Sequence, residues 1–134
     1  MNDRQIAIAR SCLEAAETNA KSFPEIVGSL MDAGFEGYAV DFRRATATYY
    51  LPDGASAELA AQAVATPVAP SLDGARLQAA IREAQQLVPG YTYRGFCEKA
   101  AAAGCAGYVV SFSGRRALYI GRTAETHVEL FPPS

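Results

Sequence analysis

Two stretches of the chain repeat the same order of hydrophobic and polar positions, seventy residues apart. Gly-Phe-Glu-Gly-Tyr-Ala-Val-Asp-Phe at 34–42 aligns with Gly-Cys-Ala-Gly-Tyr-Val-Val-Ser-Phe at 104–112. Upstream, apolar residues follow the three- and four-residue spacing of a half-buried helix. They are Phe23, Ile26, Val27, Leu30 and Ala33 in one copy, and Tyr93, Phe96, Cys97, Ala100 and Ala103 in the other. This similarity at a constant offset predicts an internal duplication.

Capping residues predict where these two helices begin and end. Ser22 with Glu25 three residues later forms a capping box, and Pro24 suits the first helical turn. The second helix begins at Thr92. Gly34 and Gly104 should end the two helices, because glycine accepts the left-handed backbone conformation at low cost.

Alternating residues after each glycine predict strands, at 38–42 and 108–112. Hairpins are expected near Arg43-Arg44 and Ser113-Gly114, with returning strands at 45–51 and 116–121. Residues 57–59 resemble residues 128–130, which predicts a short third strand in each copy.

A further amphipathic helix is predicted ahead of each unit, so the expected order is α-α-β-β-β, twice. The two stripes are Ile6, Ala9, Leu13 and Ala16, then Leu77, Ala80, Ile81, Ala84 and Leu87. We expect an α+β protein with one mainly antiparallel sheet, helices on one face and a pseudo-two-fold axis. Residues 1–134 would form a single domain, with repeats at about 3–59 and 73–131 and a connector at 60–72.

The second face of this sheet is expected to differ between the copies. It would present Ala39, Asp41, Thr46, Thr48 and Tyr50 in the first copy, and Val109, Ser111, Leu118 and Ile120 in the second. The second set is apolar and requires a cover. The connector, a dimer partner and a ligand are three alternatives that the sequence leaves open.

Charge and composition narrow the classes of partner. The formal charge is −2, and it divides into −4 for residues 1–66 and +2 for residues 67–134. A general nucleic-acid binder is disfavoured, because it needs a basic face to displace counterions. No charge-free stretch reaches the length of a membrane span, and the N-terminal residues lack the apolar core of a secretory signal, so a cytoplasmic protein is expected.

The segment Tyr91-Thr92-Tyr93-Arg94-Gly95-Phe96-Cys97-Glu98-Lys99-Ala100, with Ala103-Gly104, Tyr108-Val109-Val110 and Gln85-Gln86, carries a family resemblance. It resembles small bacterial, prophage-associated proteins catalogued as domain of unknown function 1398 and often labelled phage envelope protein. The resemblance covers nearly the whole chain. It implies a shared fold, and it includes no catalytic motif.

The titratable residues do not form a recognisable catalytic pattern. His127 is the only histidine, and a general base would also need a nucleophile and an orienting carboxylate within reach. A solvent-facing or hydrogen-bonded structural histidine is the favoured interpretation. Cys12, Cys97 and Cys105 lack CxxC spacing, which favours reduced, buried thiols over a metal site or a disulfide. No cofactor or metal is predicted.

Arginine doublets at the two predicted hairpins are the most suggestive feature. Arginine binds carboxylate or phosphate in bidentate fashion, so Arg43, Arg44, Arg115 and Arg116, with Arg122 nearby, could hold an anionic partner. The alternative is that these charges keep the sheet edges unpaired. Tyr38 and Tyr108 could line a pocket, although their positions also suit the core.

The favoured interpretation is a non-enzymatic cytoplasmic binding or regulatory module. A homodimer and an anionic ligand or protein partner are the expected forms of binding. A small enzyme using His127 with a thiol or carboxylate, and a structural phage component, are the two alternatives.

Overall fold

The computed structural model describes residues 1–132 and contains four helices and six strands. Their order is α1 (Asp3–Glu17), α2 (Phe23–Asp32), β1 (Gly37–Asp41), β2 (Thr46–Tyr50), β3 (Ser56–Ala60), α3 (Gly74–Gln86), α4 (Tyr93–Ala102), β4 (Cys105–Ser111), β5 (Arg116–Gly121) and β6 (Thr126–Leu130). The order α-α-β-β-β therefore occurs twice, and the α+β prediction is confirmed.

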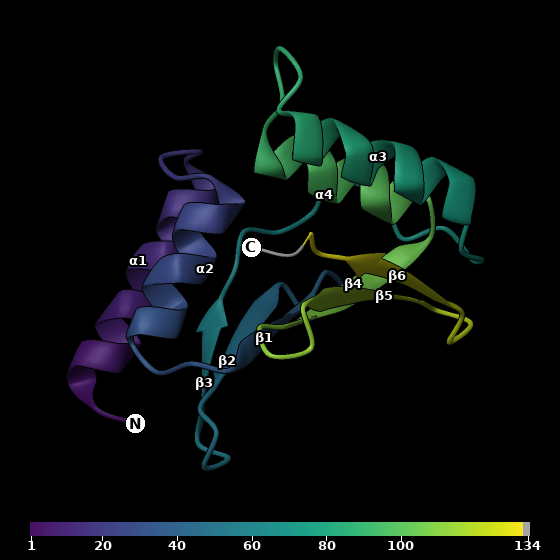
Figure 1. Ribbon diagram of the computed structural model, residues 1–134. Helices are drawn as coiled ribbons and strands as arrows, with labels where there is room; N and C mark the ends of the chain where they lie inside the picture. Colours follow the sequence, from purple (N-terminus) through teal and green to yellow (C-terminus); the bar gives the residue numbers. More distant parts are fainter. Residues whose placement is uncertain (133–134) are drawn as a thin grey trace.

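All six strands form one antiparallel sheet in the order β3-β2-β1-β4-β5-β6. The two central strands, β1 and β4, come from different halves of the chain, and Ala39 faces Val109 across them. The helices lie on one side of the sheet as two pairs, α1 with α2 and α3 with α4 (Figure 1). The outer strands β3 and β6 are the two edges.

Helix ends follow the predicted capping residues. Ser22 and Glu25 form the capping box of α2, and the Thr92 side chain accepts a hydrogen bond from the Gly95 N–H at the start of α4. Gly34 and Gly104 follow these helices with φ of +96° and +90°. The prediction that Leu87 belongs to the buried stripe of α3 is wrong. Leu87 ends α3 in a left-handed conformation and is 59% exposed, because the helical pattern stops at Gln86.

The core lies between the sheet and the helices. It contains residues from both halves, of which the largest that are fully buried are Leu30, Leu77, Ile81, Val110 and Cys105. Tyrosines 38, 49, 108 and 119 point from the sheet into this layer, and each is at most 7% exposed. Neighbouring rings pack with centroids 5.4 Å apart in the pairs Tyr38–Tyr49 and Tyr108–Tyr119. The inward face of the sheet is therefore a continuous aromatic layer.

Candidate interaction surface

The face of the sheet opposite the helices, here called the open face, has one apolar half. Residues that face one another across the strands form a row of Ala39, Val109, Leu118 and Val128. With Ile120 and Leu130, the last three of these form what we call the apolar patch, on β4, β5 and β6. Val109, Val128 and Leu130 are 40%, 43% and 64% exposed. Large apolar side chains gathered on a surface commonly mark a contact site.

The other half of the open face is polar. Glu58 and Thr48 continue the same row beyond Ala39, and Asp41 lies in the next row, opposite Thr46. The sequence pattern predicted this difference between the halves, and the register confirms it.

The connector is not the cover of the open face. The Gln62 N–H donates to the Glu17 carboxylate on α1, and the Ala69 N–H donates to the Ala101 carbonyl at the end of α4. Both partners belong to helices, so this segment lies on the helix side of the sheet. The ribbon follows the same path, rising from the end of β3 between the two helix pairs (Figure 1).

Polar side chains on the inward face of β6 hold this outer strand against α3. His127 Nε2 lies 2.7 Å from Gln78 Oε1, and Glu129 accepts from Gln85 Nε2 at 2.7 Å and from the Tyr119 hydroxyl at 2.8 Å. Burial and the nearby Glu129 carboxylate both raise the pKa of Tyr119. His127 is thus half-buried with an amide partner. A hydrogen-bonded structural histidine is expected to have such surroundings.

The arginine doublets are not brought together. Arg43 and Arg44 lie in the β1–β2 hairpin, and Arg115 and Arg116 in the β4–β5 hairpin. Because β1 and β4 are antiparallel neighbours, these hairpins lie at opposite ends of the central strand pair. One small anion cannot contact both doublets.

Individual arginine contacts are local. Arg44 lies 3.7 Å from the Glu58 carboxylate, and both side chains are more than half exposed. Arg115 donates to the Pro132 carbonyl, Arg116 to Gly114, and Arg122 to Val68. Only Arg116 lies within a strand, directly opposite Leu130 on the open face.

The three thiols are buried and free. Burial raises the pKa of Cys97 to about 12 and the pKa of Cys105 to about 11, and it also raises the pKa of Cys12. All three are therefore protonated at neutral pH, and the thiolate is the nucleophilic form.

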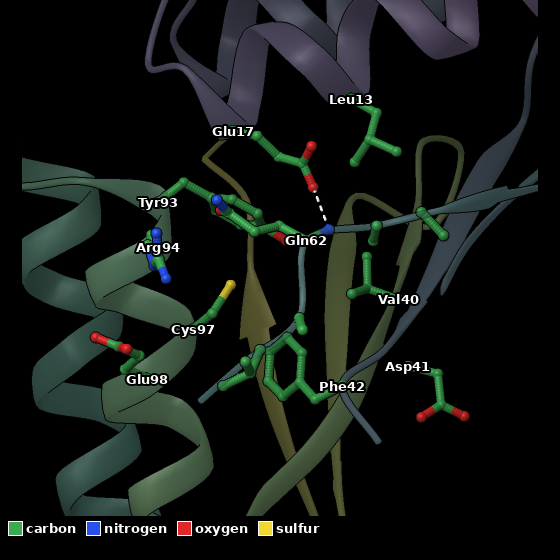
Figure 2. Close-up of a pocket in the computed structure, with 14 residues that line it drawn as sticks. Leu13, Glu17, Val40, Asp41, Phe42, Gln62, Tyr93, Arg94, Cys97 and Glu98 are labelled. Carbon is green, nitrogen blue, oxygen red and sulfur yellow. Dashed lines mark hydrogen bonds between the residues drawn. The ribbon is translucent and has the colours of Figure 1, made fainter. Parts of the chain in front are cut away.

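A pocket on the helix side reaches Cys97 but is small. It lies between the end of α1, the start of α4 and the connector, and Leu13, Glu17, Phe42 and Tyr93 line it together with Cys97 (Figure 2). Its volume of about 20 Å³ matches roughly one water molecule.

Residues 1–132 match neither the pattern of a metal-binding cluster nor that of a membrane-spanning helix. No group of three or more His, Cys, Asp or Glu side chains there is arranged to hold a metal ion. Within the same range, every helix is too short or too polar to cross a membrane.

The predicted third strands are present as β3 and β6, but the alignment of residues 57–59 with 128–130 is wrong by one residue, because Glu58 and Val128 hold the equivalent places opposite Thr48 and Leu118. Within β6, only His127 was predicted as a candidate functional residue. The signal was available, because Thr126, Val128 and Leu130 alternate with His127 and Glu129 in a strand that ends the repeat. What could not be read from this alternation was that β6 is an edge of the sheet.

Comparison with known proteins places the chain in a family without assigning an activity. No curated protein matches it. A family model described as "Protein of unknown function (DUF1398)" matches residues 11–128, which is most of the chain. The chain therefore belongs to the DUF1398 family of proteins of unknown function.

Proposed function

We propose that this protein is a non-enzymatic binding module whose contact surface is the apolar patch on the open face. The observation that carries the proposal is the difference between two halves of one sheet face, one polar and one with Val109, Val128 and Leu130 exposed. The helices and the connector belong to the opposite side. Only a molecule from outside this arrangement can remove the patch from water.

The charges around the patch suggest the chemistry of the partner. Arg116 is the one charged residue on the open face of β4–β6, and Arg115 and Arg122 lie in the adjoining turns. The β1–β3 half of the same face carries the carboxylates Asp41 and Glu58. The partner is therefore a folded protein that offers an apolar surface with carboxylates at its rim, since such pairs combine hydrophobic burial with charge complementarity.

An enzyme using His127 is less well supported. The His127 ring contacts an amide, and the raised pKa values of Cys97 and Cys105 keep both thiols protonated at neutral pH. A thiol that cysteine-specific reagents modify at pH 7 faster than free cysteine would contradict this argument.

Photo-crosslinking tests the binding proposal. A photoreactive amino acid at position 118, in the patch, is expected to give a protein adduct of one defined mass in cells that make the protein. The matched control is position 48, which lies in the same cross-strand row on the polar half. Arg116→Glu should abolish the adduct at position 118. Equal adducts from both positions, or none from 118, would overturn the proposal.

A structural role in a phage particle predicts a different result. Sedimentation of the purified protein would then give large assemblies of defined size, whereas a binding module remains a small species. The prophage association is carried by the family resemblance, and no contact in residues 1–132 adds to it.

We also infer that the chain is an internal duplication that forms one domain with a pseudo-two-fold axis. Helices α2 and α4 begin and end seventy residues apart. Ala45 and Arg115, also seventy apart, have φ of 54° and 52° in the two hairpins. Between β1 and β4, a shift of seventy exchanges the pair Tyr38–Val110 with the pair Val40–Tyr108, which supports an axis near Ala39 and Val109. Solving related chains that carry a single copy would test this inference.

We place the module in the cytoplasm. Three free cysteines in a chain of this size support a reducing compartment. Fractionation of cells that make the protein provides the test.

A further inference from the structure

The outer strand β6 presents a free row of backbone hydrogen-bonding groups. The Phe131 N–H donates to the Arg115 carbonyl, and the Gly121 N–H donates to the Glu125 carbonyl. Odd-numbered residues of β6 therefore direct their backbone groups toward β5, because antiparallel pairs alternate along a ladder without shifts. It follows that Thr126, Val128 and Leu130 direct their N–H and C=O groups away from the sheet.

The other edge has the same backbone geometry and different side chains. The Ala61 N–H donates to the Ala45 carbonyl, so Ser56, Glu58 and Ala60 direct their backbone groups outward from β3. Glu58 occupies the middle of this row and lies 3.7 Å from Arg44. A charged side chain in the middle of an edge strand opposes pairing with another strand, because pairing would desolvate it.

No such charge protects β6. The three residues with outward backbone groups have the side chains of Thr126, Val128 and Leu130, and the last two are 43% and 64% exposed. The charged Glu129 points to the opposite face, where Tyr119 and Gln85 bind it. Contacts to α3 through Gln78 and Gln85 also hold β6 in an extended form, which lowers the entropic cost of pairing.

We propose that a second copy of this chain pairs with β6, edge to edge and antiparallel, around a two-fold axis at Val128. Val128 then faces Val128 of the second copy, and Thr126 faces Leu130 in both directions. Each facing pair exchanges two N–H···O bonds. The result is a continuous twelve-stranded sheet, since each copy contributes six strands.

Self-pairing fits this edge better than pairing with β3 of another copy. An antiparallel β6–β6 contact is isologous and closes as a dimer, whereas β6 on β3 would leave an edge free at each end and grow into chains. It would also set Val128 against the charged Glu58. In the β6–β6 dimer, the cross-strand row of Val109, Leu118 and Val128 continues into the same row of the second copy, so the apolar patch is doubled.

Proline substitution tests this pairing with a matched control. Val128→Pro removes one outward N–H and leaves the bonds to β5, since the Val128 N–H does not point toward β5. Glu58→Pro makes the same change at the same place in β3, seventy residues earlier. Sedimentation velocity of the full chain at 1 to 100 µM is expected to show a dimer for the wild type and Glu58→Pro. Val128→Pro should weaken dimerisation by at least tenfold.

If Val128→Pro does not fold, a second variant and a second measurement still test the proposal. Val128→Glu copies the β3 residue and should give a monomer with an unchanged far-ultraviolet circular dichroism spectrum. Hydrogen exchange of the wild type should slow with concentration at the Val128 and Leu130 amides and remain constant at Glu58 and Ala60. A wild-type monomer at 100 µM, or a dimer that withstands both substitutions, would overturn the proposal. The crosslink at position 118 is read separately, so the two proposals can fail independently.

Discussion

The outer strand β3 carries Glu58 at the place where the outer strand β6, seventy residues later, carries Val128. Both strands direct the backbone groups of these residues outward, and both pair with an inner strand over five residues. The backbone is alike and the side-chain chemistry is opposite. Two similar units in one sheet can thus leave one edge protected and the other free to bind.

The helix side of the sheet shows a second difference between the halves. After β3 the chain continues with Ala61, next to a pocket of about 20 Å³, and after β6 it continues with Phe131. The Phe131 ring packs on Phe23 of α2 with centroids 5.4 Å apart. Tyr93 of α4 occupies the matching position in the pocket beside Ala61. A large side chain fills one end of the space between the helix pairs, and a small one leaves the other end partly open.

The largest expected difference in stability is between alanine substitutions at Gly34 and Gly104, the glycines that end α2 and α4. A Cβ at position 104 would lie 2.0 Å from the Ser71 carbonyl oxygen, whereas a Cβ at position 34 would have Gln5 Nε2 as its nearest neighbour at 3.6 Å. Both positions have positive φ. Gly104→Ala should therefore cost more than about 4 kcal/mol, and Gly34→Ala about 1 kcal/mol for backbone strain alone. Urea denaturation gives both values, and equal losses would refute the close approach of the connector.

A comparison at alkaline pH uses the buried thiols. The pKa of Cys105 is about 11 in the folded protein against an ordinary 9.0, so the folded state holds this proton longer than the unfolded state does. The contribution of Cys105 to the free energy of unfolding should therefore be constant below about pH 9 and fall as the pH rises toward 11. The slope is at most about 1.4 kcal/mol per pH unit for each such group. Cys105→Ala should reduce the slope in urea denaturation between pH 9 and 11, and an unchanged slope would contradict its burial.

Removal of the aromatic ring after β6 tests the two ends of the space between the helix pairs. Phe131→Ala loses the contact with Phe23, and we expect a cost of about 1 kcal/mol because Phe131 is only half-buried. Ala61→Gly is the matched truncation beside the pocket and removes a single methyl group. Thermal unfolding of both variants measures the difference. An equal loss would show that the two ends are packed alike.

The smallest expected difference concerns the first turns of α2 and α4. Ser22 exchanges two hydrogen bonds with Glu25, whereas Thr92 accepts only one, from Gly95, which has no side chain to return a bond. Ser22→Ala should cost about 1 kcal/mol and Thr92→Ala about 0.5 kcal/mol. Denaturant midpoints compare the two. A larger loss at Thr92 would contradict the role assigned to the capping box.

Patterns within a few residues were enough to predict the helices and where they end. The spacing of Ile26 and Leu30 specifies a buried helical face, and the glycine at position 34 specifies its end, since both effects act within a few residues. Two positions of the predicted helix stripes are wrong, because Phe23 in the first turn of α2 is 42% exposed and Leu87 lies beyond the end of α3. The error at Leu87 has a local origin. The apolar character of Leu87 suggested a further helical turn, but the backbone at this residue adopts φ of 47°. A turn follows, in which the Tyr91 N–H donates to the Val88 carbonyl.

The sequence by itself determined the order of the elements, the inward aromatic positions and the polar and apolar halves of the open face. Only the tertiary structure decided that β1 pairs with β4, that the connector lies among the helices and that β6 is an edge. The reason is physical. Periodicity and capping reflect interactions within a few residues, whereas strand neighbours and the path of a connector depend on contacts between residues far apart in the chain.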